Sequence, residues 1–168
     1  MLIRLNIKNF ALIEEITVEF SEGFNILSGE TGAGKSILID AIDYVLGGKF
    51  SKDLIRTGEE RTFVEAIFSI DNDNVNHVLD ELGIEYDDML IISRETLLSG
   101  KSIIKVNGRS LIITQLKRIR EKILDIHGQH QNQSLLQRSS HILYLDNYIG
   151  EDIEEPLNKF LNLKRSEE

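Results

Sequence analysis

The residues best suited to chemistry lie between positions 29 and 36, where the sequence reads GETGAGKS. This segment matches G-x-x-x-x-G-K-[ST] at every fixed position. Glycines in such a loop let the backbone curl, so that successive N–H groups point at phosphate oxygens. The lysine then reaches the β- and γ-phosphates, and the serine hydroxyl binds Mg²⁺. The predicted phosphate site comprises Gly29, Glu30, Thr31, Gly32, Ala33, Gly34, Lys35 and Ser36.

The segments on either side of this loop are those that a phosphate loop requires. Residues 23–28 form a short, mainly apolar run that predicts a buried strand. After the loop, apolar residues recur at helical spacing up to Val45, and Gly47-Gly48 is a plausible stop. By chance, the loop pattern would arise in roughly one chain of this size in a hundred. The sequence therefore predicts a strand, a phosphate loop and a helix in that order.

The rest of the chain predicts an α/β protein. Alternation of apolar and polar residues predicts an antiparallel pair of strands at 2–8 and 16–20. Further predicted strands are 62–70, two strands within 88–110 that turn at Ser99-Gly100, and 123–126, and the predicted helices are 73–83, 111–123 and 134–148. In the tail from Glu151, acidic residues precede Pro156 and an apolar stripe follows, as at the start of a long helix. Because the stripe is still running at Glu168, we expect a longer protein.

Composition narrows the possible classes of protein. A chain of 168 residues fits one domain, and the absence of cysteine excludes disulfides and cysteine-based metal sites. No apolar run approaches the ~20 residues of a membrane span, so a cytoplasmic protein without a membrane partner is expected. The net charge of −9 argues against coating nucleic acid with the whole surface.

Phosphoryl transfer also needs an acidic residue near the metal. Asp71, Asp125 and Asp146 are the candidates. A turn explains Asp71 and a helix explains Asp146, whereas Asp125 lies inside a shorter apolar run and no carboxylate follows it. We therefore expect the catalytic acid to lie outside this chain. The polar run HGQHQNQ at 127–133 is typical of a loop that faces a ligand. Four basic residues at 117–122 form either a solvated helix face or a nucleic-acid contact.

Several segments in order resemble the RecN family of bacterial DNA repair proteins, within the SMC-like branch of ABC-type ATPases. They are LIRLNIKNFALIEEITVEF, FNILSGETGAGKSILIDAIDYVLGG, LIRTG, KSIIKVNGR and LDIHGQHQNQSLL. The resemblance implies an ABC/SMC-type P-loop head that is split in the sequence. Residues 1–150 would form its N-terminal lobe, with an antiparallel β layer beside a sheet that bears the P-loop. Residues 151–168 would begin a coiled-coil arm.

The resemblance also implies roles for single residues. Gln129 would be the Q-loop glutamine that contacts the metal and the attacking water, with His127, His130 and Gln131 as neighbouring candidates. Lys35 and Gln129 would be the catalytic residues of this lobe, Ser36 and Gln129 would bind Mg²⁺, and Arg56 would lie near the phosphates of ATP. Other SMC-like heads often carry a basic or hydroxyl residue after NF, whereas Ala11 and Leu12 stand there in this chain.

The mechanism implied by the family needs several partners. The C-terminal lobe of the same protein would complete the ATPase, and two heads would form a homodimer around two ATP molecules. DNA, double-stranded or with ends, would be engaged in double-strand-break repair and recombination at the nucleoid.

Three alternative functions are open to a chain with a phosphate loop. They are a non-catalytic interaction module, the nucleotide-binding subunit of an ABC transporter and a small-molecule P-loop kinase, although no basic lid segment favours a kinase.

Overall fold

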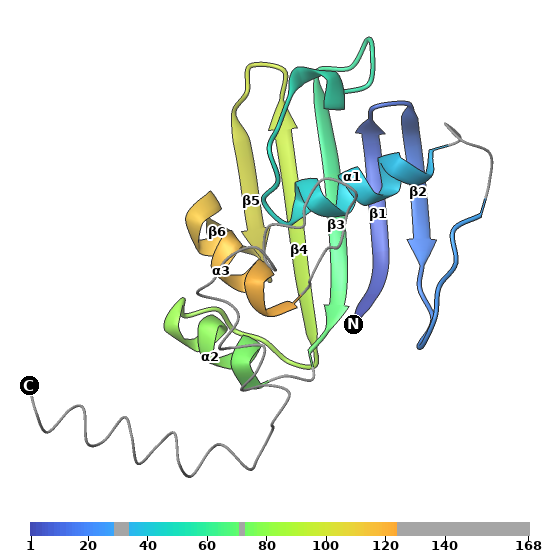
Figure 1. Ribbon diagram of the computed structural model, residues 1–168. Helices are drawn as coiled ribbons and strands as arrows, with labels where there is room; N and C mark the ends of the chain where they lie inside the picture. Colours follow the sequence, from blue (N-terminus) through green and yellow to red (C-terminus); the bar gives the residue numbers. More distant parts are fainter. Residues whose placement is uncertain (29–33, 71–72, 124–168) are drawn as a thin grey trace, which may run out of the picture. The chain divides into compact units, whose positions relative to one another are not determined.

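The computed structural model describes residues 1–28, 34–70 and 73–123, all within the unit Met1–Leu124 (Figure 1). In chain order its elements are β1 (Leu2–Phe10), β2 (Ile13–Glu19), α1 (Lys35–Val45), the 3-10 helix η1 (Lys52–Leu54), β3 (Arg61–Ser69), α2 (Asp73–Glu81), β4 (Met89–Leu97), β5 (Ser102–Val106), β6 (Arg109–Leu111) and α3 (Ile113–Ile123). The predictions for 124–126, 134–148 and 151–168, and the lobe boundary at 150, lie outside the described residues. Within these three ranges no helix is both long and apolar enough to cross a membrane.

The six strands form one antiparallel sheet in the order β2-β1-β3-β4-β5-β6. The predicted pairing of β1 with β2 is confirmed, with Leu5 opposite Val18 and Ile7 opposite Ile16. Since side chains alternate between the two faces of a strand, these four apolar residues share one face. We call this the inner face, because α1 packs on it, and the opposite one the outer face.

The hydrophobic core lies between the inner face and the helices. The helix predicted after the phosphate loop is confirmed as α1, which buries Ala41, Tyr44 and Val45. The Tyr44 ring packs on Phe10 of β1, with 5.4 Å between the ring centroids. The helices predicted at 73–83 and 111–123 are confirmed as α2 and α3, which contact each other. Core burial therefore holds α1 in a fixed place on the sheet.

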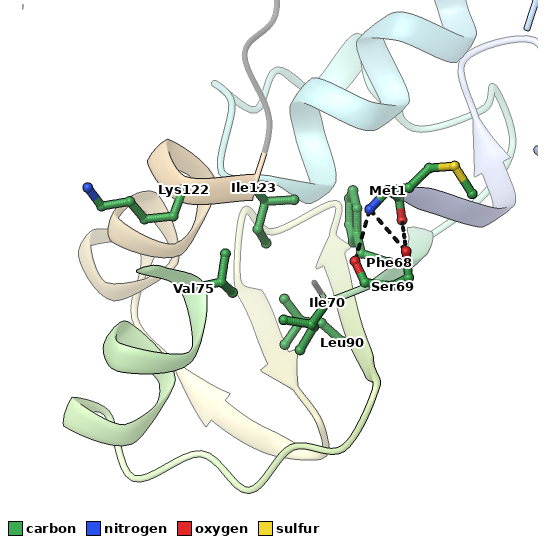
Figure 2. Close-up of a pocket in the computed structure, with 8 residues that line it drawn as sticks. All are labelled: Met1, Phe68, Ser69, Ile70, Val75, Leu90, Lys122 and Ile123. Carbon is green, nitrogen blue, oxygen red and sulfur yellow. Dashed lines mark hydrogen bonds between the residues drawn. The ribbon is translucent and has the colours of Figure 1, made fainter. Parts of the chain in front are cut away.

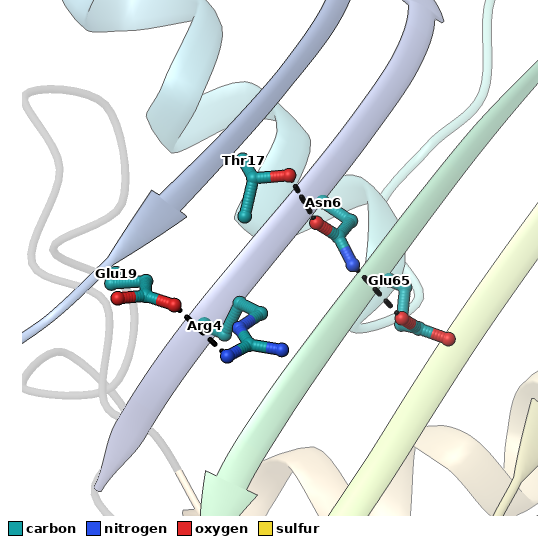
Figure 3. A network of polar contacts seen from close by, with 5 residues as sticks. All are labelled: Arg4, Asn6, Thr17, Glu19 and Glu65. Atoms are coloured by element: carbon teal, nitrogen blue, oxygen red, sulfur yellow. Dashed lines mark hydrogen bonds and ion pairs between the residues drawn. The ribbon is translucent and has the colours of Figure 1, made fainter.

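Polar side chains of the outer face bind one another across neighbouring strands (Figure 3). Asn6 of β1 donates to Glu65 of β3 at 3.1 Å and accepts from the Thr17 hydroxyl of β2 at 2.7 Å. Arg4 forms an ion pair with Glu19 at 2.9 Å. Exposed ion pairs of this kind contribute only about 0–1 kcal/mol each. On this part of the outer face, Arg4 therefore already has a carboxylate as its partner.

The segment 88–110 forms three strands rather than the predicted two. The turn after β4 at Ser99-Gly100 is confirmed, but a second turn at Asn107-Gly108 adds β6. Asn107 and Gly108 both have positive φ, 45° and 80°, as a tight hairpin turn requires. The Asn107 side chain accepts from the Ile91 N–H at 2.8 Å and donates to the Glu85 carbonyl at 2.9 Å. The second turn is thereby bound to the start of β4.

The strand predicted at 23–28 is wrong for the structure of this chain. These six residues form no strand, and the Phe24 side chain is 94% exposed. Ile26 and Leu27 are exposed as well. A strand needs a neighbour for its backbone N–H and C=O groups, and none of the described strands pairs with this segment. The second sheet that was expected to bear the P-loop is therefore not formed by the described residues.

Candidate nucleotide-binding site

The first turn of α1 has the features of an anion site. Gly34 precedes the helix with φ 93° and ψ −3°, a left-handed conformation that favours glycine. Its carbonyl accepts the first helical hydrogen bond, from the Leu38 N–H at 3.2 Å. No side chain forms a capping hydrogen bond at Gly34, and the first turn holds no acidic residue. The N–H groups at this end and the positive end of the helix dipole therefore suit a phosphate.

The structure describes three of the eight residues of the predicted phosphate site. Lys35 is the first residue of α1 and is half-buried, whereas Ser36 follows it and is exposed. A Cβ built on Gly34 would meet nothing within 4 Å. Glycine is therefore favoured there by the left-handed backbone conformation rather than by a lack of space for a side chain. Residues 29–33 lie outside the described residues. The lysine and serine of the motif thus begin the helix, as the chemistry requires.

Arg94 of β4 binds the other end of α1. It is 5% exposed, and its Nη1 donates to the carbonyls of Tyr44 and Gly48, both at 2.8 Å. Its Cζ also lies 4.4 Å from the centroid of the Tyr44 ring. The last carbonyls of a helix have no partner within the helix, and a cation is favoured at the negative end of its dipole. Arg94 therefore satisfies the C-terminal end of α1 from the sheet.

A chain of hydroxyl groups completes this buried contact. The Tyr44 hydroxyl donates to Thr96 Oγ1 at 2.6 Å, Thr96 and Ser102 share a hydrogen bond of 2.8 Å, and Arg94 Nε donates to Ser102 at 3.0 Å. Burial raises the pKa of the Tyr44 phenol, which its bond with Thr96 and the charge of Arg94 oppose. Burial also lowers the pKa of Arg94, which Tyr44 and Asp43 oppose.

These contacts fix where the N-terminal end of α1 lies. Its last turn is bound to β4 through Tyr44 and Arg94. Eleven residues of α-helix are about 16 Å long, and the three strand spacings from β4 to β2 come to about 14 Å. Figure 1 shows α1 crossing the strands in this direction. The first turn of α1 therefore lies toward the β2 edge of the sheet.

Helix α3 is bound to α1 as well. Arg120 donates to Asp43 at 2.7 Å in a half-buried ion pair, and Arg118 pairs with Glu81 of α2. Gly47, which follows α1, also lies close to α3. A Cβ built on it would be 3.4 Å from Ile113, and its φ of 96° favours glycine as well. Two of the four basic residues at 117–122 therefore bind other helices. The structure favours a packing role for them over a nucleic-acid contact.

Arg56 belongs to a polar cluster beside the turn between β1 and β2. Its Nη2 lies 3.2 Å from Glu14 Oε2, and its Nη1 lies 3.9 Å from Glu59 Oε1. Asn9 donates from Nδ2 to Glu59 at 2.9 Å, and its carbonyl accepts from the Arg56 N–H at 3.0 Å. We call these four residues the Arg56 cluster. The structure thus pairs Arg56 with carboxylates, while its predicted contact with phosphates stays a prediction.

A separate hollow of about 220 Å³ lies near the N-terminus (Figure 2). Five apolar side chains line it. They are Phe68 of β3, Ile70 just after that strand, Val75 of α2, Leu90 of β4 and Ile123 of α3. The ammonium group of Met1 donates to the Ser69 carbonyl at 2.9 Å and to its hydroxyl at 3.1 Å. None of the lining residues belongs to α1. This hollow is therefore separate from the first turn of α1.

The other predicted site residues lie outside the described residues. They are Gln129, its neighbours His127, His130 and Gln131, and the acid candidates Asp71, Asp125 and Asp146. Among the described residues, no group of three or more carboxylate or imidazole side chains could hold a metal ion. The Ser36 hydroxyl is thus the one predicted metal ligand that the structure describes, on the first turn of α1.

Sequence reasoning missed Arg94 and Asp43, which bind α1 to the rest of the fold. A signal for Arg94 was present. Along β4, Leu90, Ile92, Arg94 and Thr96 alternate with exposed or half-buried residues, so Arg94 falls on the buried face. A charged residue in an otherwise apolar register indicates a buried partner. No comparable signal marked Asp43, because its partner lies 77 residues away.

Comparisons with known proteins agree with this arrangement. The family model of the AAA domain matches residues 4–168. DNA repair protein RecN of Bacillus subtilis is 44% identical over 162 residues, which are 95% of this chain and 28% of that protein. RecN of Vibrio cholerae is 36% identical over 155 residues, 89% of this chain and 27% of that protein. The chain therefore spans less than a third of the length of these curated relatives.

Solved structures extend the comparison to the fold. A chain described under ATP-driven dimerization and DNA-stimulated activation of SMC ATPases aligns with a TM-score of 0.64 at 24% identity, over 86% of this chain and 95% of that chain. The Smc head domain of Pyrococcus furiosus gives 0.60 at 26%, over 72% and 32%. RecF-ATP gives 0.52 at 26%, over 66% and 27%. The predicted fold class, an α/β lobe of an ABC/SMC-type P-loop ATPase head, is confirmed.

Proposed function

We infer that this chain, which belongs to the AAA domain family, is the ATP-binding N-terminal lobe of the ATPase head of a RecN-like DNA repair protein. One observation carries the inference. A left-handed Gly34 leads directly into a helix whose first two residues are Lys35 and Ser36, and no side chain forms a capping hydrogen bond at its N-terminal end. This is the arrangement that holds a triphosphate.

Each residue of the site has a proposed role toward ATP and Mg²⁺. The backbone from Gly29 to Ser36 would hold the phosphates, with the Lys35 ammonium on the β- and γ-phosphates. The Ser36 hydroxyl and Gln129 would bind Mg²⁺, and Gln129 would also orient the attacking water. When bound, Mg²⁺ neutralises charge on the β- and γ-phosphate oxygens. Arg56 would supply a second cation near the phosphates.

Hydrolysis of ATP to ADP and phosphate would require the C-terminal lobe of the same protein. In the family, that lobe carries the signature segment, the acidic metal ligand and the switch histidine. The exposed apolar residues Phe24, Ile26 and Leu27 support this division, because they offer a surface and a backbone for further polypeptide to pack and pair with. Within this proposal, the present chain binds ATP and the complete head hydrolyses it.

The complete protein would work as a pair of heads in double-strand-break repair and recombination. Two heads would enclose two ATP molecules, so that ATP holds the homodimer together and hydrolysis releases it. DNA, double-stranded or with ends, would be the macromolecular partner, in the cytoplasm at the nucleoid and without a membrane partner. The RecN names of the relatives support this role. They also favour it over the transporter subunit.

The rate of ATP turnover tests this function. We expect little hydrolysis by the chain alone, and turnover at least tenfold higher once the C-terminal lobe is supplied as a separate polypeptide. The reason is that the missing lobe contributes the metal acid. A mixture in which Lys35 is replaced by alanine provides the control for contaminating ATPase. If the wild-type mixture neither binds nor hydrolyses ATP, the chain is better described as a non-catalytic interaction module.

A further inference from the structure

Helix α1 is held mainly by its C-terminal half. All three of its buried residues, Ala41, Tyr44 and Val45, lie in that half. The preceding residues 34–40 are all described, and each of their side chains is half-buried or exposed. The polar contacts of α1 with β4 and α3 also lie at its last turn. The direction of the first turn of α1 is therefore set by an anchor at the opposite end of the helix.

Arg94 is the central residue of this anchor. Its Nη1 donates to the carbonyls of Tyr44 and Gly48, both at 2.8 Å, and its Nε donates to the Ser102 hydroxyl at 3.0 Å. A guanidinium is planar and its donors point in fixed directions, so these bonds set the direction of α1 relative to β4 as well as its distance. Apolar packing is non-directional by comparison. Strand β4 is a firm support, because it pairs with β3 on one side and β5 on the other.

A small change of direction at this anchor becomes large at the other end of α1. A helix of eleven residues is about 16 Å long, so a tilt of about 5° about its C-terminal end moves its first turn by about 1.4 Å. Hydrogen bonds tolerate less than this, since their donor–acceptor distances span only about 2.7–3.2 Å. After such a tilt, the N–H groups at the start of α1 could not keep all of their bonds to a phosphate.

We propose that Arg94 is a positioning residue for the nucleotide, which acts through α1 from the end of the helix opposite the phosphate loop. The proposal rests on the function inferred above and concerns the same site. With Arg94 in place, α1 directs the N–H groups of its first turn at the phosphates. Without the guanidinium, the carbonyls of Tyr44 and Gly48 lose this donor, and the end of the helix turns toward water or another donor. The first turn then moves with it.

The affinity for Mg-ATP, measured with fully folded protein, tests the proposal. Arg94→Met should raise the Kd by about 3- to 10-fold, as expected for one or two weakened hydrogen bonds. Arg94→Lys keeps a charge but lacks the planar set of donors, so its Kd should lie between those of the wild-type chain and Arg94→Met. Calorimetric titration without denaturant gives the three values, at a temperature where circular dichroism shows each protein to be folded. Should Arg94→Met fail to fold, a wild-type Kd for Arg94→Lys overturns the proposal.

Two control variants separate position from stability and from charge. Leu79→Ala opens a cavity beneath α2, which packs against α3, and should destabilise the chain about as much as Arg94→Met does. Arg61→Met removes the same charge from the outer face. Both controls should leave the Kd within about twofold of the wild-type value. A wild-type Kd for Arg94→Met, or an equal rise in Kd for Leu79→Ala, would overturn the positioning role.

The same titrations separate this proposal from the proposed function. If the wild-type chain binds Mg-ATP, and Lys35→Ala weakens that binding while Arg94→Met does not, the nucleotide site stands and the positioning role fails. If the wild-type chain does not bind Mg-ATP, the nucleotide site and the positioning role both fail.

Discussion

Alanine in place of Lys35 is expected to weaken the binding of Mg-ATP by about 10- to 100-fold. The ammonium group would otherwise make charge-assisted hydrogen bonds to the β- and γ-phosphates, the strongest class of hydrogen bond in proteins. Lys35 begins α1 directly after Gly34, so its backbone N–H also stands at the N-terminal end of the helix, where the phosphates are proposed to bind. Calorimetric titration of both proteins with Mg-ATP measures the difference.

The matched control for this change is Lys49→Ala. Lys49 is exposed in the segment that follows α1, at the end of the helix opposite the phosphate loop. Its replacement removes the same charge from the chain but should leave the Kd within about twofold of the wild-type value. If both variants lost affinity equally, only the net charge would matter, and Lys35 would have no specific role.

Methionine in place of Arg94 is expected to lower the free energy of unfolding by about 2–4 kcal/mol. The substitution keeps an unbranched apolar stem but removes every donor of the guanidinium. The carbonyls of Tyr44 and Gly48 and the Ser102 hydroxyl then lose their bonds to it in a buried place. Unsatisfied buried acceptors cost the full penalty of removing them from water. Urea unfolding measures the loss.

Two further variants show whether this loss comes from the buried contact. Arg61→Met removes an arginine that pairs with Glu95 at 3.5 Å on the outer face and should cost no more than about 1 kcal/mol. Arg94→Lys keeps a charge but cannot bind the carbonyls and Ser102 together, so its loss should fall between the other two. Equal losses for Arg94→Met and Arg61→Met would contradict the role of Arg94 at the end of α1.

Much of the sheet and the start of the site could be predicted because their signals are local. Apolar and polar residues alternate along β1 and β2. Leu5 and Ile7 of β1 are buried in the core, and β2 pairs with β1 at the edge of the sheet. The phosphate loop is a motif of eight consecutive residues, of which Gly34, Lys35 and Ser36 stand at the start of a helix as predicted. A short stretch of sequence is enough to predict an element or a site when the residues that determine it are consecutive in the chain.

Other features could not be predicted, since they depend on residues far apart in the chain. The apolar run at 23–28 has the composition of a strand, yet a strand forms only beside another strand. The contact between Arg94 and Tyr44 spans 50 residues and that between Arg120 and Asp43 spans 77. Strand β6 was missed for a different reason: three residues are too few to show alternation.

A crystal structure of the chain with Mg²⁺ and a non-hydrolysable ATP analogue tests the inferred site most directly. We predict the triphosphate at the first turn of α1, with the backbone N–H groups of Gly34 to Ser36 and the Lys35 ammonium within hydrogen-bond distance of its oxygens. Nucleotide found elsewhere, for instance in the hollow lined by Phe68 and Leu90, with no ligand at the start of α1, would contradict the assignment.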